Sequence, residues 1–237
     1  HRDLHSFPTR RSSDLGLLTL EIGVVLAGLT VLLADLWIPT GMRRKLTHAA
    51  AGFLGFLLLA SFTRWIDSGE TGTAFGGMFI QDGISLFFKR LFLLTAIIVL
   101  VFSFDFADRL PSAALGEYGA LTLFALAGMM LAASANDLSV LFVSVELITV
   151  TFYVLVSFQR ARTVSLEAGV KYLIIGALAS AIMVYGIALV YGTAGSMKFD
   201  RVAAAAPALA DNRVFLIGVL LVMAGLGFKI AAFPMQL

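Results

Sequence analysis

Residues 138–158 read LSVLFVSVELITVTFYVLVSF, a run in which Glu146 is the only charged side chain. A helix needs about 20 mostly apolar residues to cross the hydrocarbon core of a bilayer. The run has that length, and it lacks the alternation of apolar and polar residues over about 10 positions that marks a barrel strand. It therefore predicts a membrane-spanning α-helix with one carboxyl group near its middle.

Six further segments have the same character. They lie near residues 16–38, 46–62, 86–104, 115–134, 166–191 and 214–237. Together with 138–158 they predict an all-α fold, a polytopic transmembrane helix bundle of about seven spans. We place the first three spans in residues 16–107 and the other four in residues 108–237.

The composition excludes most other classes of protein. Of 237 residues, 59% are hydrophobic and 14% are charged, whereas an average soluble domain has about 25% charged residues. This excludes a soluble enzyme, a disordered chain and a nucleic-acid-binding module. The chain has no cysteine, which excludes disulfides and thiolate metal sites. Membrane lipid is the expected surrounding, and nucleic acid is not an expected partner.

Residues 1–15, HRDLHSFPTRRSSDL, differ from the rest because they are polar and contain three arginines. The apolar run that starts at Gly16 is too long for a signal peptide and has no clear cleavage site. We interpret residues 1–15 as a non-native tail. Without them His48 is the only histidine, so we expect no histidine metal site.

Basic residues in short loops predict the orientation. They occur at 43–45, after the first span, and at 160–162, after the fifth. If the spans alternate, both loops lie on one side, which we expect to be cytoplasmic, and the native N-terminus is then periplasmic. Lys89 and Arg90, at the start of the third span, favour the opposite orientation but are outnumbered.

Three charged side chains stand out because they lie deep inside the spans: Glu146, Lys171 and Lys229. A charge at the bilayer centre costs about 2.5–3.5 kcal/mol on insertion scales, and it usually pairs or lines a polar pathway. Glycines at 225 and 227 and a proline at 234 flank Lys229, and this pattern predicts a broken seventh helix. Burial disfavours a charged lysine and a nearby carboxylate favours it. An acid and two lysines on consecutive spans therefore suggest a device that moves ions.

Each charge also has a simpler interpretation. Glu146 could accept a hydrogen bond from a neighbouring serine or threonine and hold two helices together. Lys171 could extend its amine to the cytoplasmic interface. Glu21 and Asp35 lie near the two ends of the first span, where an interfacial position is expected.

The second half of the chain resembles a known family. The matching stretches are LAASANDLSVLFVSVELITVTFYVLVSF (131–158), SLEAGVKYLIIGALASAIMVYGIALVYG (165–192) and GLGFKIAAFP (225–234). They resemble subunit N of the bacterial proton-pumping NADH:quinone oxidoreductase, respiratory complex I. The tract VSLEAGVKYLIIGALASA favours subunit N over its antiporter-like sister subunits L and M.

The resemblance implies roles for the buried charges. Glu146 is similar to the family's fifth-helix glutamate, Lys229 to the lysine on its broken seventh helix and Lys171 to its sixth-helix lysine. In the family these groups relay protons through a half-channel. Gln236 stands where many members have a histidine, so no proton role of that histidine applies here.

The resemblance also implies that the chain is a fragment. Members contain two inverted repeats, and this chain ends inside the seventh helix, so residues 108–237 are the truncated start of the first repeat. By itself it should not pump protons.

The first hypothesis is therefore a proton-translocating subunit of an NADH:quinone oxidoreductase in the bacterial inner membrane. Its partners are the other membrane subunits of complex I. The resemblance implies no cofactor and no redox catalysis in this chain; NADH, FMN, iron–sulfur clusters and quinone belong to partner subunits. The second hypothesis is a subunit of a multi-subunit cation/proton antiporter, which gene neighbourhood would distinguish. A third is a membrane scaffold, in which substituting Glu146 or Lys229 has no effect.

Overall fold

The computed structural model describes residues 14–39, 42–63, 66, 71–106 and 115–232. The chain divides into two compact units, residues 1–135 and 136–237, and each is considered by itself. Residues 1–13 of the proposed non-native tail lie outside the described residues.

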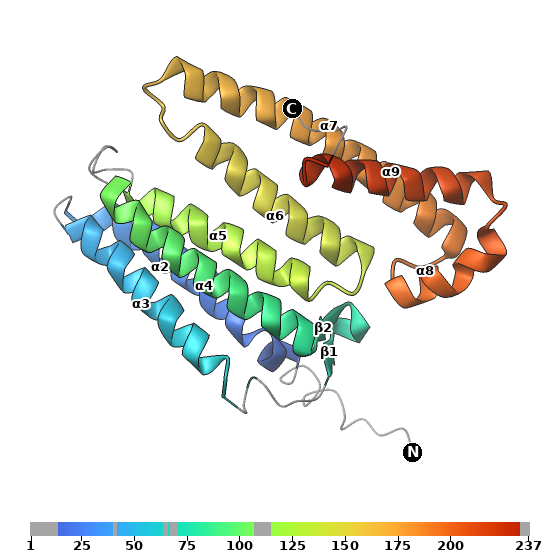
Figure 1. Ribbon diagram of the computed structural model, residues 1–237, viewed down its shortest axis with the longest axis horizontal. Helices are drawn as coiled ribbons and strands as arrows, with labels where there is room; N and C mark the ends of the chain where they lie inside the picture. Colours follow the sequence, from blue (N-terminus) through green and yellow to red (C-terminus); the bar gives the residue numbers. More distant parts are fainter. Residues whose placement is uncertain (1–13, 40–41, 64–65, 67–70, 107–114, 233–237) are drawn as a thin grey trace. The chain divides into compact units, whose positions relative to one another are not determined.

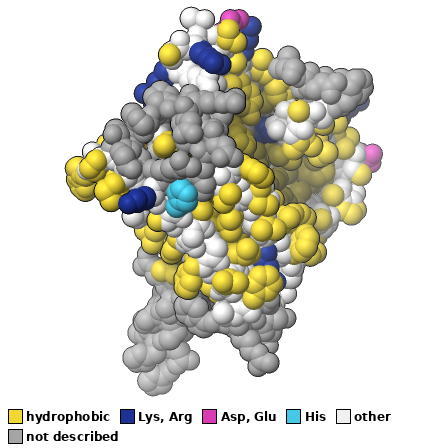
Figure 2. All heavy atoms as spheres, turned by 60° about the vertical axis from the view of Figure 1, so that its left-hand side comes forward, with side chains coloured by type: hydrophobic (Ala, Val, Ile, Leu, Met, Phe, Trp, Pro, Cys, Tyr) yellow, Lys and Arg dark blue, Asp and Glu magenta, His cyan; other side chains and the backbone are white. Residues whose placement is uncertain are grey.

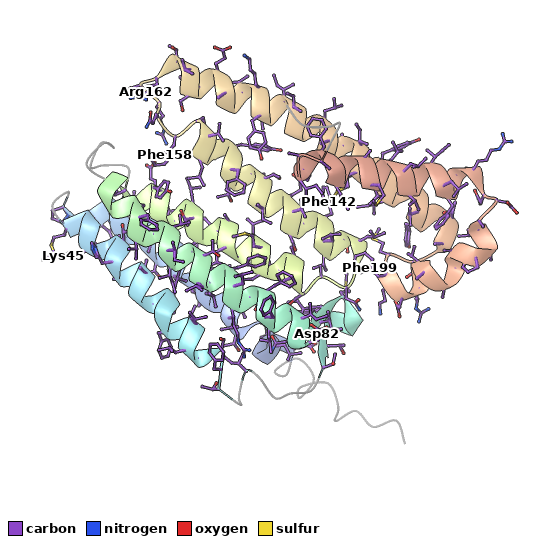
Figure 3. All side chains as sticks on the ribbon, viewed as in Figure 1. Lys45, Asp82, Phe142, Phe158, Arg162 and Phe199 are labelled. Atoms are coloured by element: carbon purple, nitrogen blue, oxygen red, sulfur yellow. The ribbon has the colours of Figure 1, made fainter. Side chains whose placement is uncertain are left out.

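The first unit is a helical bundle with a small hairpin (Figure 1). Its helices are α2 (Thr19–Trp37), α3 (Arg43–Ala60), α4 (Gly83–Phe106) and α5 (Leu115–Ala133). The four helices share one apolar core, in which Val24, Leu54, Leu93 and Leu123 are fully buried. Lys45 and Asp82 mark opposite ends of this bundle (Figure 3).

The outer faces of the helices are also apolar. The exposed large hydrophobic side chains include Leu26, Phe56, Leu94 and Phe102. On the face drawn in Figure 2, hydrophobic side chains cover most of the described surface and charged ones are few. Such a surface would be an aggregation hazard in water, but it suits contact with lipid chains.

The connection between α3 and α4 contains a hairpin that the sequence analysis did not predict. Strands β1 (Gly72–Ala74) and β2 (Phe79–Gln81) pair antiparallel, with Thr73 opposite Ile80. A 3-10 turn, η2 (Phe75–Gly77), joins the strands. The amide of Ile80 donates to the carbonyl of Ser134, directly after α5. Strands this short carry too few residues for a period-2 pattern to show in the sequence.

The second unit consists of helices (Figure 1). They are α6 (Leu138–Val156), α7 (Thr163–Ala194), α8 (Phe199–Ala205), the 3-10 turn η5 (Ala206–Leu209) and α9 (Arg213–Lys229). The side chains of Asp137 and Asn212 accept backbone N–H groups at the starts of α6 and α9, as helix N-caps do. Arg162 lies at the α6–α7 turn and Phe199 at the opposite end of the unit (Figure 3).

The seven predicted spans correspond to seven helices among the described residues, α2 to α7 and α9. Five of them, α2, α4, α5, α6 and α7, are long and apolar enough to cross a membrane. The apolar part of α3 is the shorter stretch Lys45–Ala60, and α9 has 17 residues. The fold is therefore a membrane helix bundle as predicted, while the span count of seven stays a prediction.

Small residues bring α7 and α9 into close contact. A Cβ atom added to Gly186 would lie 2.7 Å from the amide nitrogen of Val222, and one on Gly218 would lie 3.0 Å from that of Val190. One on Gly225 would lie 2.5 Å from Cβ of Met183. The two backbones can approach this closely only because no side chain separates them. This packing fixes the position along α7 at which the end of α9 lies.

Helix α9 ends at Lys229, inside the segment where the sequence predicts a break. Ala231 adopts a left-handed conformation with φ of 51°, and the amide of Ala232 donates to the carbonyl of Gly227 at 2.8 Å. The break is thus present on its N-terminal side. Residues 233–237, including Pro234 and Gln236, lie outside the described residues, so a second half of this helix stays a prediction.

Candidate functional site

Glu146 and Lys229 meet inside the second unit. The Lys229 ammonium nitrogen lies 2.5 Å from Oε1 of Glu146. The same ammonium donates to the hydroxyl oxygen of Ser180 at 3.0 Å and of Thr149 at 3.3 Å. These three acceptors use all three N–H donors of a lysine, so the site holds a fully hydrogen-bonded ammonium.

Three helices position this cluster. Glu146 and Thr149 are three residues apart and therefore share a face of α6, while Ser180 comes from α7. Lys229 comes from the last turn of α9, where the negative end of the helix dipole favours a cation. The Ser180 hydroxyl donates to Oε1 of Glu146 at 2.6 Å. The serine thus bridges the acid and the base.

The pair is shielded unequally. The side chain of Lys229 is 4% exposed and that of Glu146 is 24% exposed. Two opposite charges at low dielectric attract strongly, yet each would be costly alone. Each group therefore compensates the charge of the other.

Lys171 occupies a different environment. Its ammonium lies 2.6 Å from Oε1 of Glu167, one turn earlier on α7, and the two side chains are 69% and 65% exposed. The structure therefore brings Glu146 and Lys229 together but leaves Lys171 outside their cluster. Its exposed side chain agrees with the simpler interpretation of a lysine that extends to an interface.

A cavity of about 310 Å³ connects the surroundings of these lysines. It is lined by Thr149, Tyr153, Ala168, Lys171, Tyr172, Ile175, Gly176, Phe228, Lys229 and Ala231, all in the second unit. The lining combines aromatic and aliphatic surface with the hydroxyl groups of Thr149, Tyr153 and Tyr172. A cavity with several polar groups can hold water, and water can carry protons to a buried amine.

A second buried ion pair lies in the first unit. The Lys89 ammonium is 2.6 Å from Oε1 of Glu21, and their side chains are 0% and 3% exposed. Glu21 and Asp35 are both buried in the bundle, and the interfacial depth expected from their places near the ends of the first span stays a prediction. Burial could not be seen in one span, because it depends on which helices cover the residue.

The hairpin completes the surroundings of Lys89. Its ammonium donates to Oε1 of Gln81 at 3.2 Å and lies 4.8 Å from the centre of the Phe79 ring. The Gln81 amide in turn donates to the carbonyl of Ile66 at 2.9 Å. Lys89 therefore joins α4 to α2 and β2, and through Gln81 to residue 66.

One sequence signal could have revealed this pair. Spans one and three enter an alternating bundle from the same side, and Glu21 and Lys89 each lie within two turns of their helix start. Opposite charges at similar depth on two parallel helices are candidates for pairing.

Comparison with known proteins supports the resemblance found in the sequence. Residues 135–237 match the family described as NADH:quinone oxidoreductase/Mrp antiporter, transmembrane. NADH-quinone oxidoreductase subunit N of Desulforamulus reducens is 35% identical over 224 residues, which cover 94% of this chain and 46% of that protein. Subunit N of Rhodospirillum rubrum is 42% identical over 165 residues, covering 69% of this chain and 34% of that protein.

Solved structures show the same relationship. A chain of respiratory complex I from Thermus thermophilus, with bound aureothin, is similar with a TM-score of 0.71 and 28% identity, covering 92% of this chain and 45% of that chain. A chain of the Mrp complex from Dietzia is similar in fold, with a TM-score of 0.67 and 23% identity, covering 95% of this chain and 42% of that chain. The chain thus spans about half the length of the curated relatives that it matches.

Proposed function

We propose that this chain belongs with subunit N of the NADH-quinone oxidoreductases and that it forms part of a proton-translocating membrane subunit. The contact of the buried Lys229 ammonium with the partly buried Glu146, beside a cavity that Lys229 lines, is the observation that carries the proposal. In this function the pair holds a proton and passes it on when the two groups separate. Electron transfer from NADH to quinone takes place in other subunits and supplies the driving force.

The chemistry of the pair supports this role. In contact, Glu146 stabilises the protonated form of Lys229. When the carboxylate withdraws, Ser180 and Thr149 remain as neutral acceptors, and they stabilise an ammonium less than a carboxylate does. Lys229 then loses its proton to the next acceptor. No metal or redox group is required for such a cycle.

We further propose the surroundings in which the subunit works. The other membrane subunits of complex I are its partners, and the bacterial inner membrane is its location. The basic residues at 160–162 favour a cytoplasmic position of the α6–α7 turn. The cavity reaches Lys171, about two turns from the start of α7, so it extends from Lys229 toward that side. The native N-terminus is then periplasmic.

The cation/proton antiporter remains the second candidate, because the Mrp complex shares the fold. It is less supported, since the relatives that match most of this chain carry the name subunit N. An antiporter would exchange sodium ions for protons without NADH or quinone.

The test uses the full-length subunit in its assembled complex. Lys229→Ala and Glu146→Gln should each lower proton pumping, quinone reduction or both, while the complex still assembles. The matched control is Lys198→Ala, because Lys198 lies outside the cluster, at the N-cap of α8. Wild-type pumping and quinone reduction in both site variants would contradict the proposal.

A further inference from the structure

Two matching rows of residues face each other between α6 and α7. Glu146, Thr149 and Tyr153 follow at spacings of three and four along α6, and Tyr172, Gly176 and Ser180 follow at spacings of four along α7. Each row therefore lies on one helix face. The rows meet at several levels: Ser180 donates to Glu146, and the rings of Tyr153 and Tyr172 make an edge contact at 4.9 Å.

Gly176 makes room for the hydroxyl group of Tyr153. A Cβ atom added to Gly176 would lie 2.0 Å from that hydroxyl oxygen and 2.7 Å from the ring carbon that carries it. The hydroxyl thus occupies the space that any other residue at 176 would fill. Gly176 therefore does more than allow close helix packing. Its missing side chain leaves the space that the phenol oxygen of Tyr153 occupies.

The Tyr153 hydroxyl is buried without a hydrogen bond to any described residue. It nevertheless lies within hydrogen-bonding reach of the Thr149 and Ser180 side chains, and it feels the charge of Glu146. A buried hydroxyl is nearly always hydrogen-bonded to protein or to ordered water. Tyr153 lines the same cavity as Lys229, so water in the cavity is a further partner within its reach.

The hydroxyl groups of Thr149 and Ser180, which both accept from Lys229, already donate their own protons to other acceptors. Thr149 donates to the backbone carbonyl of Val145 at 3.0 Å and accepts from Lys229. Ser180 donates to Glu146 and also accepts from Lys229. Tyr153 differs from both, because its oxygen accepts no hydrogen bond from a described residue and can accept one from water.

We propose that the Tyr153 hydroxyl relays protons between cavity water and the Glu146–Lys229 pair. The inference rests on the proposed function and assigns one further residue to it. In each event the phenol oxygen accepts a proton from a hydronium ion in the cavity, which becomes water, while its own proton passes through one further water to neutral Lys229. One O–H bond forms as another breaks, so the tyrosine ends unchanged and one proton has moved.

The experiment compares four variants of the full-length subunit in assembled complex, reconstituted in sealed vesicles. Tyr153→Phe removes only the hydroxyl, and Gly176→Ala displaces it. Lys229→Ala tests the proposed function itself. Tyr185→Phe is the control, because Tyr185 is another tyrosine of α7, 62% exposed and outside the cavity lining. Proton pumping and quinone reduction are measured between pH 6 and pH 9.

The expected result for Tyr153→Phe and Gly176→Ala is a several-fold loss of pumping rate at unchanged assembly. The loss should deepen as the pH rises, because proton delivery to Lys229 then limits the rate. A purely structural role of the tyrosine ring would leave the pH profile of Tyr153→Phe unchanged. Tyr185→Phe should match the wild type.

Two outcomes overturn different claims. Wild-type pumping by Tyr153→Phe at every pH, with pumping lost in Lys229→Ala, overturns the relay and leaves the proposed function standing. Wild-type pumping by Lys229→Ala overturns the proposed function, and the relay falls with it.

Discussion

The Lys229 ammonium lies 2.5 Å from Oε1 of Glu146, although 83 residues separate the two in the sequence. The close packing of α7 on α9 through Gly186, Gly218 and Gly225 sets the height of Lys229, and Ser180 from α7 links it to Glu146 on α6. The site therefore depends on three helices. Substitutions can test the charged groups separately from the helix packing that positions them.

Ser180→Ala should weaken the pair without removing either charge. The serine hydroxyl bonds both partners, and a hydrogen bond to a charged group contributes about 1.5–3 kcal/mol. We expect pumping to fall, but by less than in Lys229→Ala. Ser180→Thr, which keeps a hydroxyl, is the matched control. A rate for Ser180→Ala equal to that of the wild type would show that the bridge is dispensable.

Lys171→Ala should lower pumping less than Lys229→Ala does. Lys171 is 69% exposed and pairs with Glu167 on its own helix, and exposed ion pairs contribute at most about 1 kcal/mol. Pumping rates of the two variants, measured at equal amounts of assembled complex, test this ranking. Equal losses would give Lys171 a place in the relay that its position in the structure does not indicate.

Lys89→Met should destabilise the first unit by about 3–5 kcal/mol, because it leaves Glu21 buried without its partner. The double variant Glu21→Gln with Lys89→Met should recover much of that loss. Thermal unfolding of the full-length subunit in detergent measures both effects. Lys45→Met, at an exposed position, is the control. If the double variant were no more stable than Lys89→Met, the unpaired charge of Glu21 would not be the main cause of the loss.

Gly218→Val should disrupt the α7–α9 contact and, with it, the site. Even a Cβ at this position approaches the backbone of α7 to 3.0 Å, so a branched side chain must push the helices apart. The amount of assembled, folded complex and its pumping rate should both fall. Gly192→Val is the control, because a Cβ on Gly192 of α7 meets nothing within 4 Å. Equal behaviour of the two variants would argue against close packing as the cause.

Much of the helical architecture could be predicted from the sequence because it is local. The predicted span 138–158 corresponds to α6, Leu138–Val156, and 115–134 to α5, Leu115–Ala133. The break near Lys229 was predicted from its flanking glycines and proline, and α9 does end there. The hairpin was missed, and in the connection 192–213 the short helix α8 was missed too, because segments this short carry little periodic signal.

The sequence by itself determined that this chain is a membrane helix bundle, since a run of about 20 apolar residues leaves the backbone no other way to satisfy its polar groups in lipid. It also marked Glu146 and Lys229 as charges that need an explanation. Only the tertiary structure decided which charges meet. A helix can turn any of its faces toward a neighbour, so the rotation and height that pair Glu146 with Lys229, and Glu21 with Lys89, come from packing contacts between distant segments.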